Sequence, residues 1–203
     1  LVGSEMCIRD SSNSIKAVAM IRSYRQRGHL IAKLDPLDML KSDYLEELHP
    51  EYYGFKKEDY QKKIFLDGVI NKNQSTVKEI LEFLRGKYCG SLGYEYMYIA
   101  NPTERKWFRD RVEQNDDFKF TLNGKKAILN KLIQAEGFEK FLHTKYVGTK
   151  RFGLDGGESL IPALEQIIKI GGQSNIKEVK IGMSHRGRLN VLANVLQKSY
   201  KRI

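Results

Sequence analysis

Apolar side chains recur at helical spacing in several stretches of this chain, and each such stretch predicts a helix. The first begins near Ser14 and ends before Asp35-Pro36, because proline cannot continue a helix. Its apolar face consists of Val18, Ile21, Tyr24 and Ile31. The second lies between Thr76 and Gly86, and its apolar stripe is Val77, Ile80, Leu81 and Leu84. Thr76 and Glu79 have the spacing of a capping box, which satisfies free N–H groups at a helix start.

Three further helices are predicted. One begins at Asn101-Pro102, where asparagine suits the N-cap and proline the first turn. The next carries the stripe Ile128, Leu129, Leu132 and Ile133. Beyond Gly137 the apolar pattern either continues that helix or forms a separate one. The last runs from Glu158 to Ile170 and is closed by Gly171-Gly172.

One short β-branched run, Val179 to Ile181, predicts the only strand, and no hairpin signal is found in the chain. Helix, strand, glycine-containing turn and helix follow in order, which is the pattern of a parallel α/β sheet. One strand cannot complete a sheet, so we expect a chain truncated at its C-terminus. The predicted fold class is an α-helical N-terminal region followed by the truncated start of an α/β domain.

The predicted domains are 14–112, helical, and 113–203, the incomplete α/β domain, with the boundary between Asp110 and Asp117. Residues 1–13 are set apart, because LVGSEMCIRD has no periodicity that continues into the next segment. These letters resemble a translated sequencing adapter. Residues 1–13 are therefore predicted to be non-native or disordered.

Composition narrows the class of protein. Of 203 residues, 41% are hydrophobic and 30% charged, which is enough for one sizeable core or two small ones. No apolar run reaches the roughly 20 residues that span a bilayer, and no secretory signal pattern is present. We therefore expect an intracellular protein. Cys7 and Cys89 lie far apart and fit no metal-ligand spacing, so both are predicted to be reduced thiols.

The net charge of +10 raises the possibility of a nucleic-acid-binding protein. Basic and acidic residues alternate along most of the chain, however, and no long block of one sign occurs. This pattern is typical of solvated helix faces. Positive charge is still informative locally, since a cleft lined by arginine favours anionic substrates.

The candidate chemistry lies in Ser184 to Arg188, directly after the predicted strand. Ligands of open α/β sheets bind beyond the carboxyl ends of strands, where loops meet helix N-termini. Arg186 and Arg188 add donors that match phosphate or carboxylate oxygens. His185 can polarise a carbonyl or relay a proton near neutral pH. The residues alone leave an anion site and a basic surface turn equally open.

A second glycine-containing stretch, RFGLDGGESLIPALE, precedes the last predicted long helix. Arg151 stands before a tight turn that either aims its guanidinium at a site or leaves it on the surface. Asp155-Gly156-Gly157 is similar to the Gly-Asp-Gly start of a magnesium motif, but no buried strand precedes it. Asp155 is instead predicted to be the helix N-cap, with Glu158 as its N3 carboxylate. No metal site is predicted, since three histidines lack partners at metal-ligand spacing: His29, His49 and His143.

Four segments, in this order and at similar spacing, resemble the N-terminal part of the 2-oxoglutarate dehydrogenase E1 family: RSYRQRGHLIAKLDPL, YCGSLGYEYMYI, KRFGLDGGESLIPALE and GMSHRGRLNVLANVL. The resemblance extends from about Ser14 to Ile203. It implies a homodimer that depends on thiamine diphosphate and Mg²⁺. Such an enzyme decarboxylates 2-oxoglutarate and passes the succinyl group to the lipoyl arm of the E2 component, in a complex that also contains E3.

The resemblance also implies roles for three residues. Arg151 and His185 would bind the 2-oxo acid, with His185 as a catalytic residue, and Arg186 would bind the cofactor diphosphate. Residues 113–203 would begin the thiamine diphosphate-binding domain. The magnesium ligands are expected beyond Ile203, so the chain by itself is expected to be inactive. The implied location is the bacterial cytoplasm or the mitochondrial matrix, with neither nucleic acid nor a membrane as partner.

Two alternatives stay open. An E1 component for the longer acid 2-oxoadipate shares much of the same pattern, and these residues do not measure substrate length. A basic helical module that binds a polyanion is an alternative from another class. It predicts binding to unrelated DNA that weakens steeply with salt.

Overall fold

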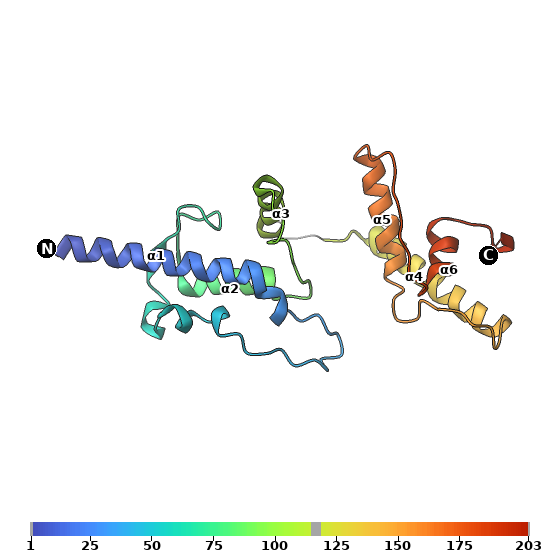
Figure 1. Cartoon of the computed structure of the whole chain (residues 1–203), viewed down its shortest axis with the longest axis horizontal. Coiled ribbons are helices and arrows are strands. Elements are labelled where there is room, and N and C mark those ends of the chain that lie inside the picture. The colour runs from blue at the N-terminus through green and yellow to red at the C-terminus, as the bar shows by residue number, and fades with distance from the viewer. Residues whose placement is uncertain (1, 115–118, 203) are drawn as a thin grey trace. The chain divides into compact units, whose positions relative to one another are not determined.

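The chain divides into two compact units. The computed structural model describes the backbone of residues 2–114 and 119–202, and the side chains from Ser11 on within those ranges. Unit 1 is Leu1–Asp117 and unit 2 is Phe118–Ile203 (Figure 1). Helices dominate both units, so the predominantly helical fold is confirmed. The domain limits at residues 112 and 113 stay a prediction.

Helix α1, Val2–Arg27, continues into a 3-10 turn, η1, Gly28–Ile31. Its fully buried apolar residues are Ala17, Met20, Ile21 and Tyr24. The predicted face was therefore partly wrong, because Val18 is 39% exposed and Ala17 occupies the core in its place. The backbone of residues 2–13 belongs to α1, and their non-native origin stays a prediction.

Helix α2, Val77–Tyr88, has the capping box that the sequence predicts. Thr76 Oγ1 accepts a hydrogen bond from the Glu79 amide at 3.2 Å, and Glu79 Oε2 accepts one from the Thr76 amide at 2.9 Å. The whole predicted stripe is buried. The helix ends at Tyr88, two residues after the expected end at Gly86. Gly86 lies inside the helix, and no atom lies within 4 Å of the position that a Cβ would take there.

Unit 1 also contains a hairpin, which the sequence analysis missed. Strands β1, Lys63–Phe65, and β2, Gln74–Thr76, pair antiparallel with Ile64 opposite Ser75. The turn between them places Asp67 and Gly68 at positive φ, 48° and 77°. The sequence signal is weak, because the connection 66–73 is longer than the two-residue turns that Asp-Gly usually marks, and strands of three residues show no clear alternation.

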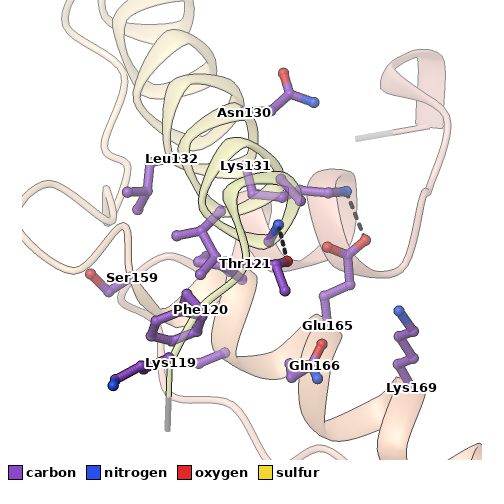
Figure 2. A pocket seen from close by; sticks show the side chains of 15 residues that line it. Lys119, Phe120, Thr121, Asn130, Lys131, Leu132, Ser159, Glu165, Gln166 and Lys169 are labelled. Atoms are coloured by element: carbon purple, nitrogen blue, oxygen red, sulfur yellow. Dashed lines mark hydrogen bonds and ion pairs between the residues drawn. The ribbon is translucent and has the colours of Figure 1, made fainter.

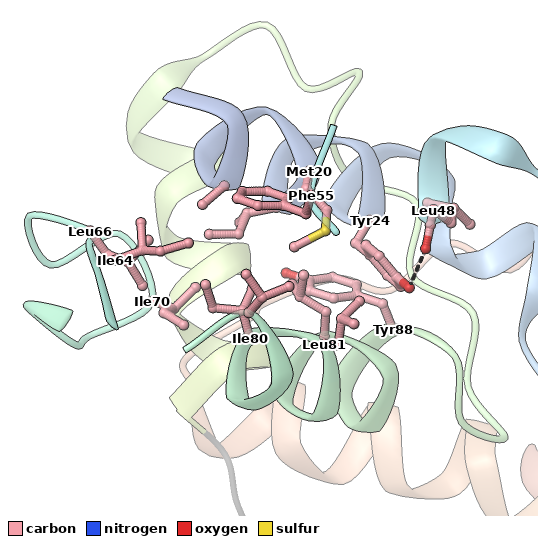
Figure 3. Close-up of a cluster of buried hydrophobic side chains, with 14 of the residues drawn as sticks. Met20, Tyr24, Leu48, Phe55, Ile64, Leu66, Ile70, Ile80, Leu81 and Tyr88 are labelled. Carbon is pink, nitrogen blue, oxygen red and sulfur yellow. Dashed lines mark hydrogen bonds between the residues drawn. The ribbon is translucent and has the colours of Figure 1, made fainter. Parts of the chain in front are cut away.

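The core of unit 1 lies between α1, α2 and the hairpin (Figure 3). Three 3-10 turns, η2 to η4, precede the hairpin: Glu46–Leu48, Pro50–Tyr53 and Lys57–Asp59. The Tyr24 hydroxyl donates to the Leu48 carbonyl at 2.7 Å, which satisfies a polar atom inside the core. The other large side chains in the core of unit 1 are Met20, Phe55, Ile64, Leu66, Ile70, Ile80, Leu81 and Tyr88.

Helix α3, Pro102–Gln114, begins as predicted, with Asn101 Oδ1 accepting from the Thr103 amide at 2.9 Å. Its far end is fixed by Glu113, which is 4% exposed. The Glu113 carboxylate accepts from Arg25 Nε at 2.7 Å and Nη2 at 2.9 Å, and from the Tyr88 hydroxyl at 2.7 Å. Burial, together with this carboxylate, raises the pKa of Tyr88 far above its usual range.

Unit 2 is built on two long helices. Helix α4, Leu122–Lys145, runs through Gly137 without a break, so the apolar pattern there continues one helix. Helix α5, Leu160–Gln173, packs against it, and a short helical segment follows as α6, Arg188–Asn190, and a π turn, η5, Val191–Val195. A last 3-10 turn, η6, is Tyr200–Arg202. The buried apolar cluster that unites these elements is small: Ala135, Leu154, Ile161 and Val191.

Two local predictions for unit 2 were wrong. Val179 to Ile181 is not a strand, because no other segment among the described residues pairs with it. The start of an α/β domain is thus not confirmed and stays a prediction. Asp155 is not the N-cap of α5, since Ser159 precedes the first helical residue and Glu158 accepts from the Gly156 amide instead. Among the described residues, no helix is both long and apolar enough to cross a membrane.

Candidate functional site

Two loops of unit 2, 151–155 and 184–188, are joined by direct contacts. The Gly187 amide donates to the Phe152 carbonyl at 2.8 Å. Arg186 Nη2 donates to the Asp155 carbonyl at 2.7 Å. The rings of Phe152 and His185 stack with their centroids 5.0 Å apart. Segments about 30 residues apart in the sequence therefore lie together, and they carry the three predicted site residues, Arg151, His185 and Arg186.

Gly187 allows this close approach. Its φ is 72°, and a Cβ at this position would lie 2.5 Å from Cδ1 of Leu154. Leu154 is 2% exposed and belongs to the core of unit 2. A side chain at position 187 would therefore both strain the backbone and push against the core. Loop 184–188 therefore requires glycine at position 187 to pass this close to Leu154.

Arg151 is held by α4. Nη1 donates to the Glu139 carbonyl at 3.0 Å, and Nη2 lies 3.0 Å from His143 Nδ1, which acts as the acceptor because guanidinium only donates. The Glu139 carboxylate is 3.9 Å from Nη1. The arginine side chain is 18% exposed. The two hydrogen bonds use two of its five N–H donors, so the group is fixed in place without being saturated.

Buried polar groups support both loops. Asn190, fully buried, donates through Nδ2 to the Ala135 carbonyl at 2.9 Å and to Glu139 Oε1 at 3.0 Å. Asn194 Nδ2 donates to Asn190 Oδ1 at 2.7 Å. Asn190, Asn194 and Glu139 were not predicted as site residues from the sequence. Helical spacing of Asn190 and Asn194 was the available signal, but their partners on α4 are remote in sequence.

His185 and Arg186 remain open to solvent. The stack on Phe152 orients the imidazole, and the bond to Asp155 orients the guanidinium. An exposed cation beside an oriented imidazole suits an anionic ligand that also carries a carbonyl. The chemistry that the sequence predicts for this loop is therefore compatible with its structure.

The carboxylate of Asp155 turns back toward Gly153, where a Cβ would stand 2.3 Å from its Oδ2. This direction explains why Asp155 does not cap α5. Within 11–114 and 119–202, no group of three or more His, Cys, Asp or Glu side chains is arranged to hold a metal ion.

A groove of about 730 Å³ lies at the start of α4 and along α5 (Figure 2). Lys131 Nζ and Glu165 Oε1 form an ion pair across it at 2.8 Å. Its lining includes Phe120, Ile128 and Pro162 but none of the three predicted site residues. The groove and the two joined loops are thus different features of unit 2.

Comparison with known proteins identifies relatives of this chain. No model of a protein family matches the chain. Relatives from Brucella canis, Brucella suis and Brucella abortus, each named 2-oxoglutarate dehydrogenase E1 component, are 54% identical over 203 residues. These alignments cover 98% of this chain and 20% of each relative, so the chain spans about a fifth of their length. Across nearly its whole length, the chain is therefore a sequence relative of the 2-oxoglutarate dehydrogenase E1 component and corresponds to the N-terminal fifth of that protein.

Proposed function

We propose that this chain is part of an enzyme that decarboxylates 2-oxoglutarate and passes the succinyl group to the lipoyl arm of an E2 component. The supporting observation is the junction of loops 151–155 and 184–188, in a chain 54% identical to relatives named for this reaction. The junction gathers two cations and an imidazole on one part of unit 2. This set of groups suits a 2-oxo dicarboxylate.

Arg151 and His185 have separate roles in this proposal. The guanidinium of Arg151 binds a substrate carboxylate with the donors that α4 leaves unused. His185, oriented by Phe152, hydrogen-bonds the oxo group and balances the change in charge as carbon dioxide leaves. Both side chains would orient the acid before the reaction begins.

The residues present fit part of a thiamine diphosphate site. Arg186 is exposed, carries a charge and donates one hydrogen bond to the Asp155 carbonyl, so its other donors match diphosphate oxygens. When bound, thiamine diphosphate supplies the electron sink for decarboxylation. Mg²⁺ ligands, a second copy of the enzyme, and the E2 and E3 partners belong to the proposal through the resemblance alone.

The experiment uses a full-length E1 component that carries residues 14–203 of this chain, hereafter the carrier E1. Its kcat/KM is measured with 2-oxoglutarate and with 2-oxoadipate. We expect 2-oxoglutarate to be preferred. A preference for 2-oxoadipate would show that the longer acid is the substrate. Turnover of neither acid, together with salt-sensitive binding to unrelated DNA, would favour the polyanion-binding module instead.

Arg186 is tested by its cofactor dependence. In the carrier E1, Arg186→Ala is expected to raise the thiamine diphosphate concentration needed for half-maximal activity by about tenfold to a hundredfold, since a charged hydrogen bond contributes roughly 1.5–3 kcal/mol. The ratio of kcat/KM for the two acids should stay the same. A changed substrate preference with unchanged cofactor dependence would show that Arg186 binds the substrate and not the cofactor.

A further inference from the structure

Glu139 contacts both halves of the candidate site, although it lies on α4 and outside either loop. Its carboxylate accepts from Asn190 through Oε1 at 3.0 Å, while Oε2 lies 3.9 Å from Nη1 of Arg151. Its backbone carbonyl accepts from the same Nη1 at 3.0 Å. One residue thus contacts the arginine of the first loop and the helix that follows the second.

The burial of this carboxylate requires an explanation. The Glu139 side chain is 3% exposed, and a buried carboxylate is costly unless it is paired and hydrogen-bonded. Among the residues that the structure describes, Asn190 and Arg151 compensate this charge. Asn190 is in turn tied to α4 at the Ala135 carbonyl and to Asn194. Glu139, Asn190 and Asn194 are all buried, so the geometry of this polar network is restricted.

The distance to Arg151 matters for function. At 3.9 Å the carboxylate attracts the guanidinium but does not form a close bidentate bond with it. The Arg151 donors not used by the Glu139 carbonyl and His143 can therefore still bind a substrate carboxylate. A closer ion pair would compete with the substrate for the same donors.

We propose that Glu139 is the positioning residue of this site. It orients the Arg151 guanidinium and, through Asn190, fixes the loop that carries His185 relative to it. This inference rests on the proposed function, and it adds a residue that acts through Arg151 and does not touch the substrate.

The test compares Glu139→Gln with unaltered carrier E1. Glutamine keeps the size and an oxygen for Asn190 but removes the negative charge that faces Arg151. We expect the KM for 2-oxoglutarate to rise about tenfold while kcat changes less than about twofold, because ground-state binding is what a misplaced Arg151 loses. The affinity for glutarate, an unreactive dicarboxylate, should fall by a similar factor in calorimetry.

A matched control lies one turn earlier on the same helix. Glu136 is exposed and pairs with Lys140 at 2.7 Å, so Glu136→Gln should change neither KM nor kcat. In the Arg151→Ala background, Glu139→Gln should have no further effect on KM, since the two residues act as one unit. Equal effects of Glu139→Gln with and without Arg151 would show a merely structural role and overturn the inference.

The remaining outcomes are also decisive. An unchanged KM in Glu139→Gln overturns the positioning role while the proposed function stands. An unchanged KM in Arg151→Ala, or no turnover by unaltered carrier E1, contradicts the proposed function and the inference with it. Where Glu139→Gln does not fold, Glu139→Asp keeps the buried charge but shortens its reach to Arg151. It is expected to raise KM about threefold, and an unchanged KM would overturn the inference.

Discussion

Gly187 is the residue on which the junction of the two loops depends. Alanine there would be held at a φ of 72° with its Cβ 2.5 Å from a buried leucine methyl. We expect Gly187→Ala to lower the free energy of unfolding of unit 2 by about 2–6 kcal/mol, the sum of backbone strain and overpacking. Urea unfolding of the dilute chain, followed by far-UV circular dichroism, measures the change.

Gly182 provides the matched control, because it has no positive φ and no atom would meet a Cβ there within 4 Å. Gly182→Ala is expected to change the free energy of unfolding by less than about 0.5 kcal/mol. Equal losses from both substitutions would mean that flexibility of the segment, and not the contact with Leu154, explains the glycine.

Cys89 offers a prediction that depends on pH. Burial raises the pKa of its thiol to about 11. Because only the thiolate is nucleophilic, Cys89 at pH 8 should react with iodoacetamide roughly a hundredfold more slowly than the same cysteine in urea. The protection belongs to the folded state and is lost as the pH rises toward the folded pKa. Peptide mass spectrometry separates it from Cys7, and equal rates in folded and unfolded chain would contradict the burial.

At the residue scale, sequence alone could name the side chains with distinctive chemistry. Arg151, His185 and Arg186 stand in short motifs, which predict them without knowledge of their neighbours in space. Glu139 and Asn190 could not be found in this way, since they are 51 positions apart and only the packing of the helical segment after loop 184–188 against α4 brings them together. No local pattern distinguishes Glu139 from its exposed neighbour Glu136.

At the element scale, predictions succeeded where the cause was local. The capping box of α2 and the N-cap of α3 depend on residues three positions apart or closer, and both are confirmed. The hairpin was missed and the strand at Val179 was wrong, because strand formation depends on a pairing partner. The cap of α5 was wrong although a cap is a local feature, because the Asp155 carboxylate turns back toward Gly153 and away from the helix start.

Glu113 fixes α3 within unit 1, and its removal should be costly. Glu113→Ala leaves the buried Arg25 guanidinium and the Tyr88 hydroxyl without their shared partner. A buried charge without its partner typically costs about 3–5 kcal/mol of stability. We expect a loss of this size in urea unfolding of the dilute chain.

The control is Glu104→Ala on the same helix. Glu104 is exposed, and its carboxylate accepts a long hydrogen bond from Asn101 at 3.4 Å. Its replacement is expected to cost less than about 0.5 kcal/mol. A small loss in both variants would show that the network around Glu113 is not what holds α3.

At the scale of the whole molecule, the two units differ in how well they bury apolar surface. Unit 1 has a large core, whereas unit 2 buries few apolar residues. On α5 and the segment after it, Ile167, Ile170, Ile176 and Val179 are 61, 50, 54 and 47% exposed. Large apolar side chains exposed in this number favour association.

We therefore predict that the isolated chain self-associates, as static light scattering at increasing protein concentration would show. A charged pair on α5, Ile167→Glu with Ile170→Lys, should shift the distribution toward monomer. A stable monomer of the unaltered chain would contradict the prediction.

The most direct test of the account is the turnover of 2-oxoglutarate by carrier E1 with His185→Ala or Arg151→Ala. Each is expected to lower kcat/KM by about a hundredfold or more, in keeping with the loss of a proton-transfer group or a charged substrate contact. His49→Ala and Arg22→Ala, from unit 1, should leave kcat/KM within about twofold, and all four variants should keep their helical content. Unchanged turnover in both His185→Ala and Arg151→Ala would contradict the central claim that the two joined loops receive the 2-oxo acid.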